Sequence, residues 1–299
     1  MNTFWPVPAA PRPLVLHAED LPDPTVLPVP GGYFIYATNN PAAHVPVVFS
    51  ADLEAFTLLG DALPRLPHWA RPGFTWAPEV IAAGDGYRLY FTARLRGTRR
   101  QVIGVATSAS PVGPFVAAPR PLITMLDLGG AIDPDVLVTA DGRRYLYWKN
   151  DGNAAHQATH LWGAPLSEDG LSLTAEPAWL LTASEPWERE LVEAPQVIEE
   201  GGTFHLLYSC ADFGDESYAI GHACGESPLG PFWKTSAAPL LASHGTLAGP
   251  GHSHAFRDDR GQWRLAYHAW QVGAVGYPHG RRSLQLSALH LEGRLARVG

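Results

Sequence analysis

Three acidic side chains at proline-containing motifs are the residues of this sequence best suited to chemistry. Asp23 and Asp133 each precede a proline, and Glu193 lies two residues before one. His252 follows a Gly-Pro-Gly sequence in the last part of the chain. Carboxylates that share one pocket can divide the roles of general acid and general base. Asp-Pro is also a common way to open a turn, so these motifs are informative only as a set.

Each of these motifs opens a stretch with the pattern of a β-hairpin. In 132–149, Asp133 is followed by alternating apolar residues, an Asp-Gly pair at Asp141, and a second run rich in tyrosine and tryptophan. Alternation on both sides of an Asp-Gly pair predicts two antiparallel strands joined by a tight turn. The same pattern recurs in four further stretches, which begin at Asp23, Ala77, Ala194 and Gly251.

The spacing of the five copies predicts the fold. They recur roughly every 54 to 61 residues, and a period of about 50 residues is typical of a propeller blade. Each copy leaves room for two more short strands, and such a blade buries its faces only against neighbouring blades. We therefore expect an all-β protein, a five-bladed β-propeller that forms a single domain over residues 1–299, with blade heads near 23, 77, 133, 194 and 252.

The heads of the repeats should meet at one place. The innermost strand of each blade lines the central channel, so Asp23, Asp133 and Glu193 are predicted to face one pocket on the axis. The five heads read Asp, Ala, Asp, Glu and His, whereas a lectin would usually repeat one site in every blade. Differentiated heads favour one active site. A non-catalytic carbohydrate-binding or scaffold propeller remains the alternative, because fold alone does not dictate function.

The composition argues against several classes of binding partner. The formal charge is -8, and the densest basic runs are pairs of arginines at 99–100, 143–144 and 281–282. This argues against nucleic acid and anionic membranes as partners. No apolar run approaches the length of about 18 residues that a membrane span needs. Residues 1–17 form a poor signal peptide, so we expect a cytoplasmic protein; the oligomeric state is left open.

Cysteine and histidine give no metal pattern. Cys210 and Cys224 are expected to be buried thiols of the fourth blade, with a disulfide between them left open. The histidines are scattered, which gives no support for catalytic zinc. Two irregular stretches, 64–74 and 212–217, are expected to shape the mouth of the pocket.

The order of the motifs resembles the family 43 glycoside hydrolases, which include arabinofuranosidases, arabinanases and β-xylosidases. The motifs are Asp-Pro at Asp23, Trp-Ala-Pro-Glu from Trp76, Ile-Asp-Pro from Ile132, Glu-Ala-Pro from Glu193, and Gly-Pro-Gly-His from Gly249. The resemblance covers nearly the whole chain. It implies a five-bladed propeller that inverts the anomeric centre while it cleaves arabinofuranosyl or xylosyl linkages.

The resemblance also implies roles for the acids. Asp23 would be the general base, Glu193 the general acid, and Asp133 the carboxylate that raises the pKa of Glu193 and orients it. An inverting glycosidase needs an ionised base and a protonated acid about 6.5–9.5 Å apart. A like charge beside Glu193 would oppose its ionisation.

Sugar recognition is expected from Trp76, as a stacking surface, and from Arg281, whose guanidinium can donate two parallel hydrogen bonds. The alternatives are a packing role for Trp76 and a solvated turn for Arg281. His252 resembles a histidine that lies under the sugar pocket in the family, often beside calcium. The chemistry requires no cofactor, but a structural calcium ion near His252 is a candidate. Calcium prefers oxygen ligands, so a hydrogen-bonded core histidine is the alternative.

The predicted function is an exo-acting hydrolase that removes α-L-arabinofuranosyl residues from short arabino- or arabinoxylo-oligosaccharides. A β-D-xylosidase or a bifunctional enzyme is the alternative, because the two sugars present nearly superposable hydroxyls, and an endo-arabinanase is a further one. The preference rests on the absence of the β-sandwich domain that many β-xylosidases of the resembling family append.

Overall fold

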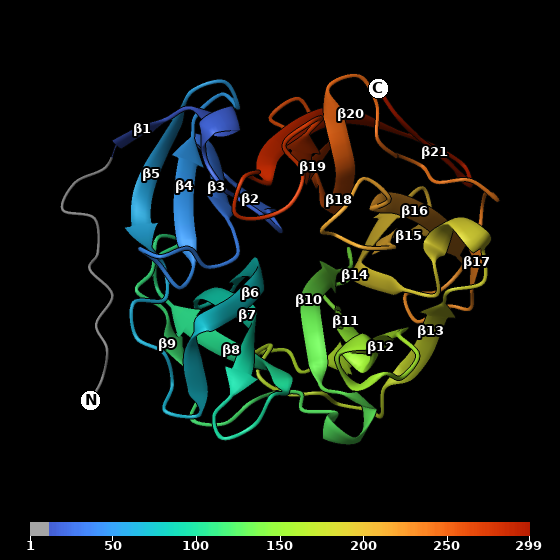
Figure 1. Ribbon diagram of the computed structural model, residues 1–299. Coiled ribbons are helices and arrows are strands. Elements are labelled where there is room, and N and C mark those ends of the chain that lie inside the picture. Colours follow the sequence, from blue (N-terminus) through green and yellow to red (C-terminus); the bar gives the residue numbers. More distant parts are fainter. Residues whose placement is uncertain (1–11) are drawn as a thin grey trace.

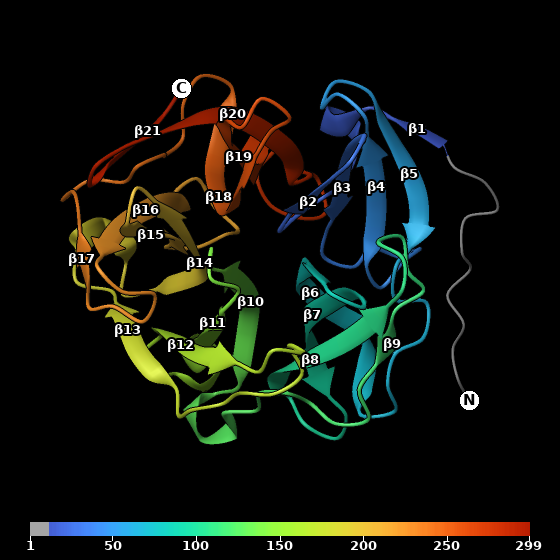
Figure 2. The ribbon, with the colours of Figure 1, turned by 180° about the vertical axis from the view of Figure 1, so that it is seen from behind.

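Five antiparallel sheets surround a central axis in the computed structural model, which describes residues 12–299 (Figures 1 and 2). Each sheet is one blade, and its first strand from the motif onward lies innermost. The inner strands are β2 (Thr25–Val29), β6 (Ala70–Ala83), β10 (Ala131–Val138), β14 (Val192–Glu200) and β18 (Leu247–Arg257). This arrangement confirms the prediction of an all-β, five-bladed propeller.

The outer strands follow in chain order within every blade. In blade one they are β3 (Gly32–Tyr36), β4 (Pro46–Ser50) and β5 (Phe56–Asp61), with β1 (Arg12–Leu14) added at the edge. In blade two they are β7 (Gly86–Leu95), β8 (Gln101–Ser108) and β9 (Val116–Ala117). In blade three they are β11 (Arg144–Asn150), β12 (His160–Leu166) and β13 (Ala178–Thr182). In blade four they are β15 (Thr203–Cys210), β16 (Ala219–Gly225) and β17 (Phe232–Lys234). In blade five they are β19 (Trp263–Gln271), β20 (Ser283–Glu292) and β21 (Leu295–Val298).

Helical structure in the described residues is limited to single 3-10 turns. These are η1 (Leu16–Ala18), η2 (Leu126–Leu128), η3 (Gly152–Ala155) and η4 (Pro186–Glu188). Within residues 12–299, no helix has the length and apolar character needed to cross a membrane.

The inner hairpins form where the alternating pattern predicts them. In blade three, Val138 of β10 pairs with Arg144 of β11 across the Asp-Gly turn, where Gly142 has a φ of 81°. Tyr147 and Trp148 of β11 point to opposite faces of the blade, yet both are completely buried. The second strand of a blade is therefore covered on both faces, by the blades on either side of it.

A residue in the left-handed backbone conformation lies at the same place in every blade head. Four of the five precede a proline, and in blades two to five the position coincides with a register shift in the inner strand. Such an irregularity redirects the side chains next to it, here toward the axis. The five residues are Asp23, Ala77, Asp133, Ala194 and His252, with φ between 44° and 57°.

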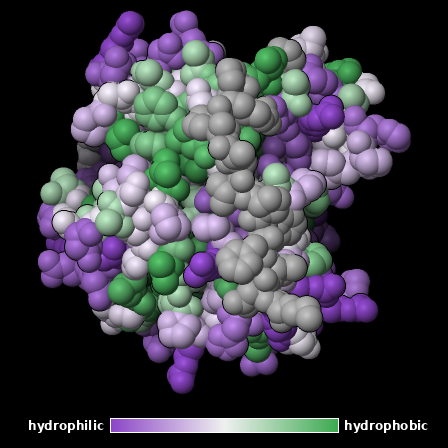
Figure 3. Space-filling view, turned by 90° about the vertical axis from the view of Figure 1, so that its left-hand side faces the viewer, coloured by the Kyte–Doolittle hydropathy of each residue, from purple (hydrophilic) through white to green (hydrophobic). Residues whose placement is uncertain are grey.

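Packing between the first and last blades closes the ring. Val26 and Ile35 of blade one share a buried cluster with Phe256 and Leu284 of blade five. The backbone N–H of Leu21 also donates a hydrogen bond to the carbonyl oxygen of Arg282, at 3.0 Å. No strand of the described chain crosses from one of these blades into the other. On the outer side of the ring near β1 and β5, hydrophobic and hydrophilic residues are intermixed (Figure 3).

Both cysteines lie in blade four, as expected. Cys210 ends β15, and Cys224 lies in β16; both are buried free thiols. None of the residues 64–74 lines the pocket itself, and the end of this stretch is not irregular, because β6 begins at Ala70. The expectation for 212–217 holds: Asp212, Phe213 and Asp215 line the mouth.

Candidate active site

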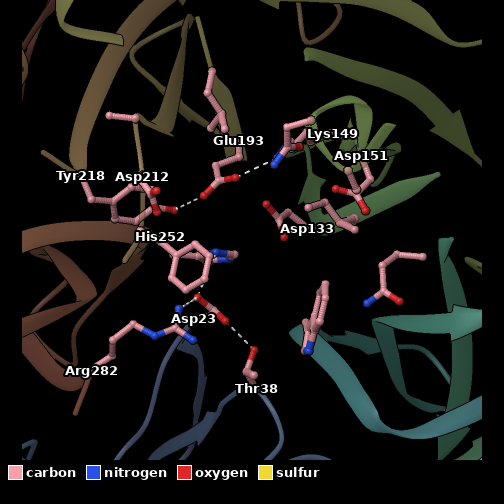
Figure 4. A pocket seen from close by; sticks show the side chains of 18 of the residues that line it. Asp23, Thr38, Asp133, Lys149, Asp151, Glu193, Asp212, Tyr218, His252 and Arg282 are labelled. Atoms are coloured by element: carbon pink, nitrogen blue, oxygen red, sulfur yellow. Dashed lines mark hydrogen bonds and ion pairs between the residues drawn. The ribbon is translucent and has the colours of Figure 1, made fainter. Parts of the chain in front are cut away.

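A cavity of about 810 Å³ lies at one end of the central channel, lined by residues of all five blades. Five of the six site residues predicted from the sequence line it. They are Asp23, Trp76, Asp133, Glu193 and His252. Figure 4 shows Asp23, Asp133, Glu193 and His252 around one space, although they come from four different blades. The three carboxylates are mostly buried, with exposed fractions of 7–9%.

Asp23 is held in its ionised form. One carboxylate oxygen accepts a hydrogen bond from Thr38 at 2.5 Å, and the other lies 3.1 Å from a guanidinium nitrogen of Arg282 (Figure 4). Burial raises the pKa of Asp23, but the charges of Arg282 and His252 and the contact with His268 outweigh burial and hold it well below the usual value. Asp23 is therefore ionised near neutral pH.

Glu193 is also held as a carboxylate. Lys149 donates to Oε2 at 2.8 Å, and the hydroxyl of Tyr218 donates to Oε1 at 2.6 Å (Figure 4). Lys149 is completely buried, so this pair is poorly screened by water. Burial raises the pKa of Glu193, but Lys149 and Tyr218 lower it below its usual value overall.

Of the three acids in the cavity, Asp133 retains a proton most readily. It accepts one hydrogen bond, from the backbone N–H of Ala194 at 3.0 Å. Burial raises the pKa of Asp133 to about 6, and the negative charge of Glu193 contributes to the rise. The expectation of a raised pKa at Glu193 is thus wrong for the free molecule. The positive charge of Lys149 reverses the effect there, and the shift falls on Asp133 instead.

The expectation for Arg281 also has to be corrected. Arg281 is exposed and does not line the pocket, whereas Arg282 is 8% exposed and does. Consecutive residues in an extended segment point to opposite sides, and the segment enters β20 at Ser283. Arg282 lies over the ring of Phe213, and its backbone N–H donates to Asp20. The arginine that lines the pocket is therefore the second of the pair.

A second set of polar side chains lies two residues beyond the heads along the inner strands. Thr25 donates to Glu79 at 2.5 Å, and Nε2 of His254 lies 3.4 Å from the same carboxylate oxygen. Within the described chain, the only group with ligand atoms close enough to share a metal ion is Glu79, Asp135 and His254. His252 is not part of this group. Its Nδ1 faces Asp23 at 3.4 Å, next to the guanidinium of Arg282, which would repel a cation. The surroundings of His252 therefore do not fit a calcium ion.

Several pocket residues were not predicted from the sequence. Lys149, Tyr218 and Thr38 contact the acids directly, and Arg282 lines the wall. Of these residues, Lys149 could have been predicted from the sequence. A regular hairpin around the Asp141 turn pairs Lys149 with Asp133, and the bulge moves it only one residue, to Ile132.

The fold and the site define a class of protein: a five-bladed propeller with buried carboxylates around an axial pocket. Pairs of carboxylates are the usual catalytic groups of glycoside hydrolases. The model of the family described as "Glycosyl hydrolases family 43" matches residues 13–289. The chain belongs to this family and is a glycosidase, which confirms the resemblance found in the motifs.

Known proteins of the family are similar over most of the chain. The Aspergillus niger β-D-galactofuranosidase xynD is 28% identical over 266 residues, which cover 83% of this chain and 73% of that protein. The Bacillus subtilis arabinoxylan arabinofuranohydrolase is 27% identical over 321 residues, and the match covers 89% of this chain but 60% of that protein. The crystal structure of a thermostable family-43 glycoside hydrolase superimposes with a TM-score of 0.83 at 26% identity, covering 99% of this chain and 95% of that one.

Proposed function

We propose that the protein is an inverting, exo-acting glycoside hydrolase that removes α-L-arabinofuranosyl residues from short arabino- or arabinoxylo-oligosaccharides. The observation that carries the proposal is the placement of Asp23 and Glu193 on different blades around one cavity (Figure 4). One carboxylate can then act on a water molecule while the other acts on the leaving oxygen, as inversion requires.

Asp23 is the proposed general base. Its contacts with Arg282 and Thr38 keep it ionised and fix its orientation. A base of this kind takes a proton from water as the water attacks the anomeric carbon.

Glu193 is the proposed general acid, and Asp133 is its proton reserve. The acid has to be protonated when the glycosidic bond breaks, whereas in the free pocket the raised pKa is that of Asp133. A bound sugar displaces water and makes two neighbouring negative charges more costly. One proton held by the pair is then available to Glu193 as the leaving oxygen gains charge.

Two side chains are proposed to hold the terminal sugar. Trp76 is partly exposed and lines the cavity, and its indole is proposed to stack on the sugar. Arg282 takes the role first expected for Arg281. The burial of the three acids that line the cavity supports exo action, because a terminal sugar can enter end-on.

The named relatives support a furanose as the terminal sugar, because one is a galactofuranosidase and another an arabinofuranohydrolase. A β-D-galactofuranosidase is therefore a second candidate. A β-D-xylosidase, a bifunctional enzyme and an endo-arabinanase remain the alternatives within the family. Rates on 4-nitrophenyl α-L-arabinofuranoside, β-D-galactofuranoside and β-D-xyloside test the proposal. The arabinofuranoside should have the highest kcat/KM, and a higher value for another sugar overturns the assignment. Binding without hydrolysis would indicate a carbohydrate-binding propeller.

A structural metal ion is proposed at Glu79, Asp135 and His254 rather than at His252. Oδ1 of Asp135 is buried without a hydrogen-bond partner, and burial together with the charge of Glu79 raises the pKa of Asp135 well above its usual value. Calcium would supply the missing positive charge to an oxygen-rich group. EDTA treatment should then lower the melting temperature, and calcium should restore it. An unchanged melting temperature contradicts the site.

A cytoplasmic location and a single domain over residues 1–299 are also proposed. Two buried free thiols suit a reducing compartment, and the packing of blade five on blade one suits one folding unit. Cell fractionation and calorimetry test these proposals. Recovery outside the cytoplasm contradicts the first, and two separate unfolding transitions contradict the second.

A further inference from the structure

Four arginines gather at the blade-two side of the cavity, on β6, β7 and the turn between β7 and β8. We call this set the arginine rim; its members are Arg71, Arg94, Arg99 and Arg100. Arg94 and Arg99 line the cavity itself. Arg71 pairs with Arg94 across the two strands. Trp76 lies on the same blade and lines the same cavity as Arg94 and Arg99.

The rim lacks anionic partners. Among residues 12–299, none of its four members has a carboxylate oxygen within ion-pair distance. The negative charge of Asp151 acts on Arg94 and Arg100 only from beyond ion-pair distance. A protein with a formal charge of -8 thus concentrates unpaired positive charge at the entrance of its cavity, where low-dielectric walls strengthen the attraction of an anion.

Arg94 is prepared to bind a planar anion. Its guanidinium lies over the ring of Phe74, 3.5 Å from the centroid, and Nε donates to Gln101 at 3.4 Å. The ring and Gln101 fix the plane of the guanidinium while its two terminal nitrogens have no hydrogen-bond partner within the described chain. A fixed guanidinium edge matches a carboxylate with two parallel hydrogen bonds. Burial, and then the charge of Arg71, lower the pKa of Arg94, and a bound anion would relieve this crowding.

We propose that the arginine rim binds the carboxylate of a uronic acid carried by the oligosaccharide beyond the bond that is cleaved. The preferred substrates are then acidic oligosaccharides, with glucuronate or galacturonate near the terminal sugar. This inference rests on the proposed function and narrows its substrate class.

The test compares an acidic oligosaccharide with its carboxyl-reduced, neutral counterpart. A glucuronate-bearing arabinoxylo-oligosaccharide and a galacturonate-bearing arabino-oligosaccharide form the two arms. We expect kcat/KM to be about tenfold higher for the acidic member of at least one pair, and the ratio to fall as salt screens the charges. The arm with the larger ratio identifies the uronic acid. A ratio of one in both arms overturns the proposal.

Variants of the rim test whether its arginines cause the preference for acidic substrates. Arg94→Gln and, as an exposed and structurally safer change, Arg99→Gln should each bring the acidic-to-neutral ratio toward one. Arg297→Gln is the matched control, because Arg297 is an exposed arginine on β21 outside the cavity, and its ratio should equal that of the unmodified protein. A ratio that survives in both rim variants contradicts the proposal.

Calorimetry separates this proposal from the proposed function. If no glycoside is hydrolysed but the acidic oligosaccharide binds more tightly than the reduced one, only the proposed function fails. If neutral glycosides are hydrolysed and the two oligosaccharides bind equally, only the arginine rim fails.

Discussion

The Nζ atom of Lys149 lies 2.8 Å from Oε2 of Glu193 in the wall of the cavity, and the lysine is buried. A buried positive charge at this distance stabilises the carboxylate, which opposes the protonation that a general acid needs. The pKa of about 6 at the neighbouring Asp133 compensates in part, because it keeps one proton in the pair up to about pH 6. The proton balance of the site is therefore set by three residues and not by two acids alone.

Replacing Lys149 by methionine keeps the length of the side chain and removes its charge. The pKa of Glu193 should rise because the stabilising positive charge is gone, so the group would stay protonated to higher pH. The alkaline limb of the kcat/KM profile should therefore move to higher pH. Lys234→Met is the control, because Lys234 forms a buried pair with Glu188 outside the cavity, and it should leave the limb in place. An unmoved limb in Lys149→Met would show that this lysine does not tune the acid.

Glu193→Ala should separate substrates by their leaving groups. Without the acid, hydrolysis of a natural linkage should fall by about 10²–10⁴-fold, whereas an activated aryl glycoside needs little protonation and should lose far less. The measurement is kcat/KM on both kinds of substrate. Equal losses would remove Glu193 from the role of acid.

The adjacent arginines form a matched pair. Arg282→Gln removes the charge that lowers the pKa of Asp23. That pKa should then rise, and the acidic limb of the pH profile should move to higher pH, with a loss in kcat/KM of about tenfold or more. Arg281→Gln changes an exposed residue and should stay within about twofold of the unmodified protein. The reverse order of the two effects would restore the first expectation for Arg281.

Asp133→Asn should stabilise the protein at neutral pH. The folded state keeps the Asp133 proton up to about pH 6, whereas the unfolded chain releases it near pH 4. Stability contributed by this group is thus present below about pH 4 and is lost as pH rises toward 6. Asparagine can still accept the hydrogen bond from Ala194 and carries no charge. At pH 7 the free energy of unfolding should rise by on the order of 2 kcal/mol, with little change at pH 4. Melting curves of both proteins at pH 7 and pH 4 measure this difference. A variant that is less stable than the unmodified protein at pH 7 contradicts the account.

The fold and the positions of the three acids could be predicted from the sequence, because both depend on repeated local patterns. Asp23, Asp133 and Glu193 could be grouped once the hairpins were recognised as blades, since equivalent strands meet on one axis. Partners contributed by loops had no such signal. Tyr218 follows an irregular stretch, and its contact with Glu193 joins two residues that are 25 positions apart. Arg281 and Arg282 could not be distinguished because the choice depends on the residue at which β20 begins.

The stereochemistry of the first product tests the central claim most directly. Proton NMR recorded during the first turnovers of an α-L-arabinofuranoside distinguishes the anomer released by the enzyme from the one formed later by mutarotation. If Asp23 activates water on one face of the sugar while Glu193 protonates the leaving oxygen on the other, the first product is the β-anomer. Initial release of the α-anomer would contradict the assignment of the two acids.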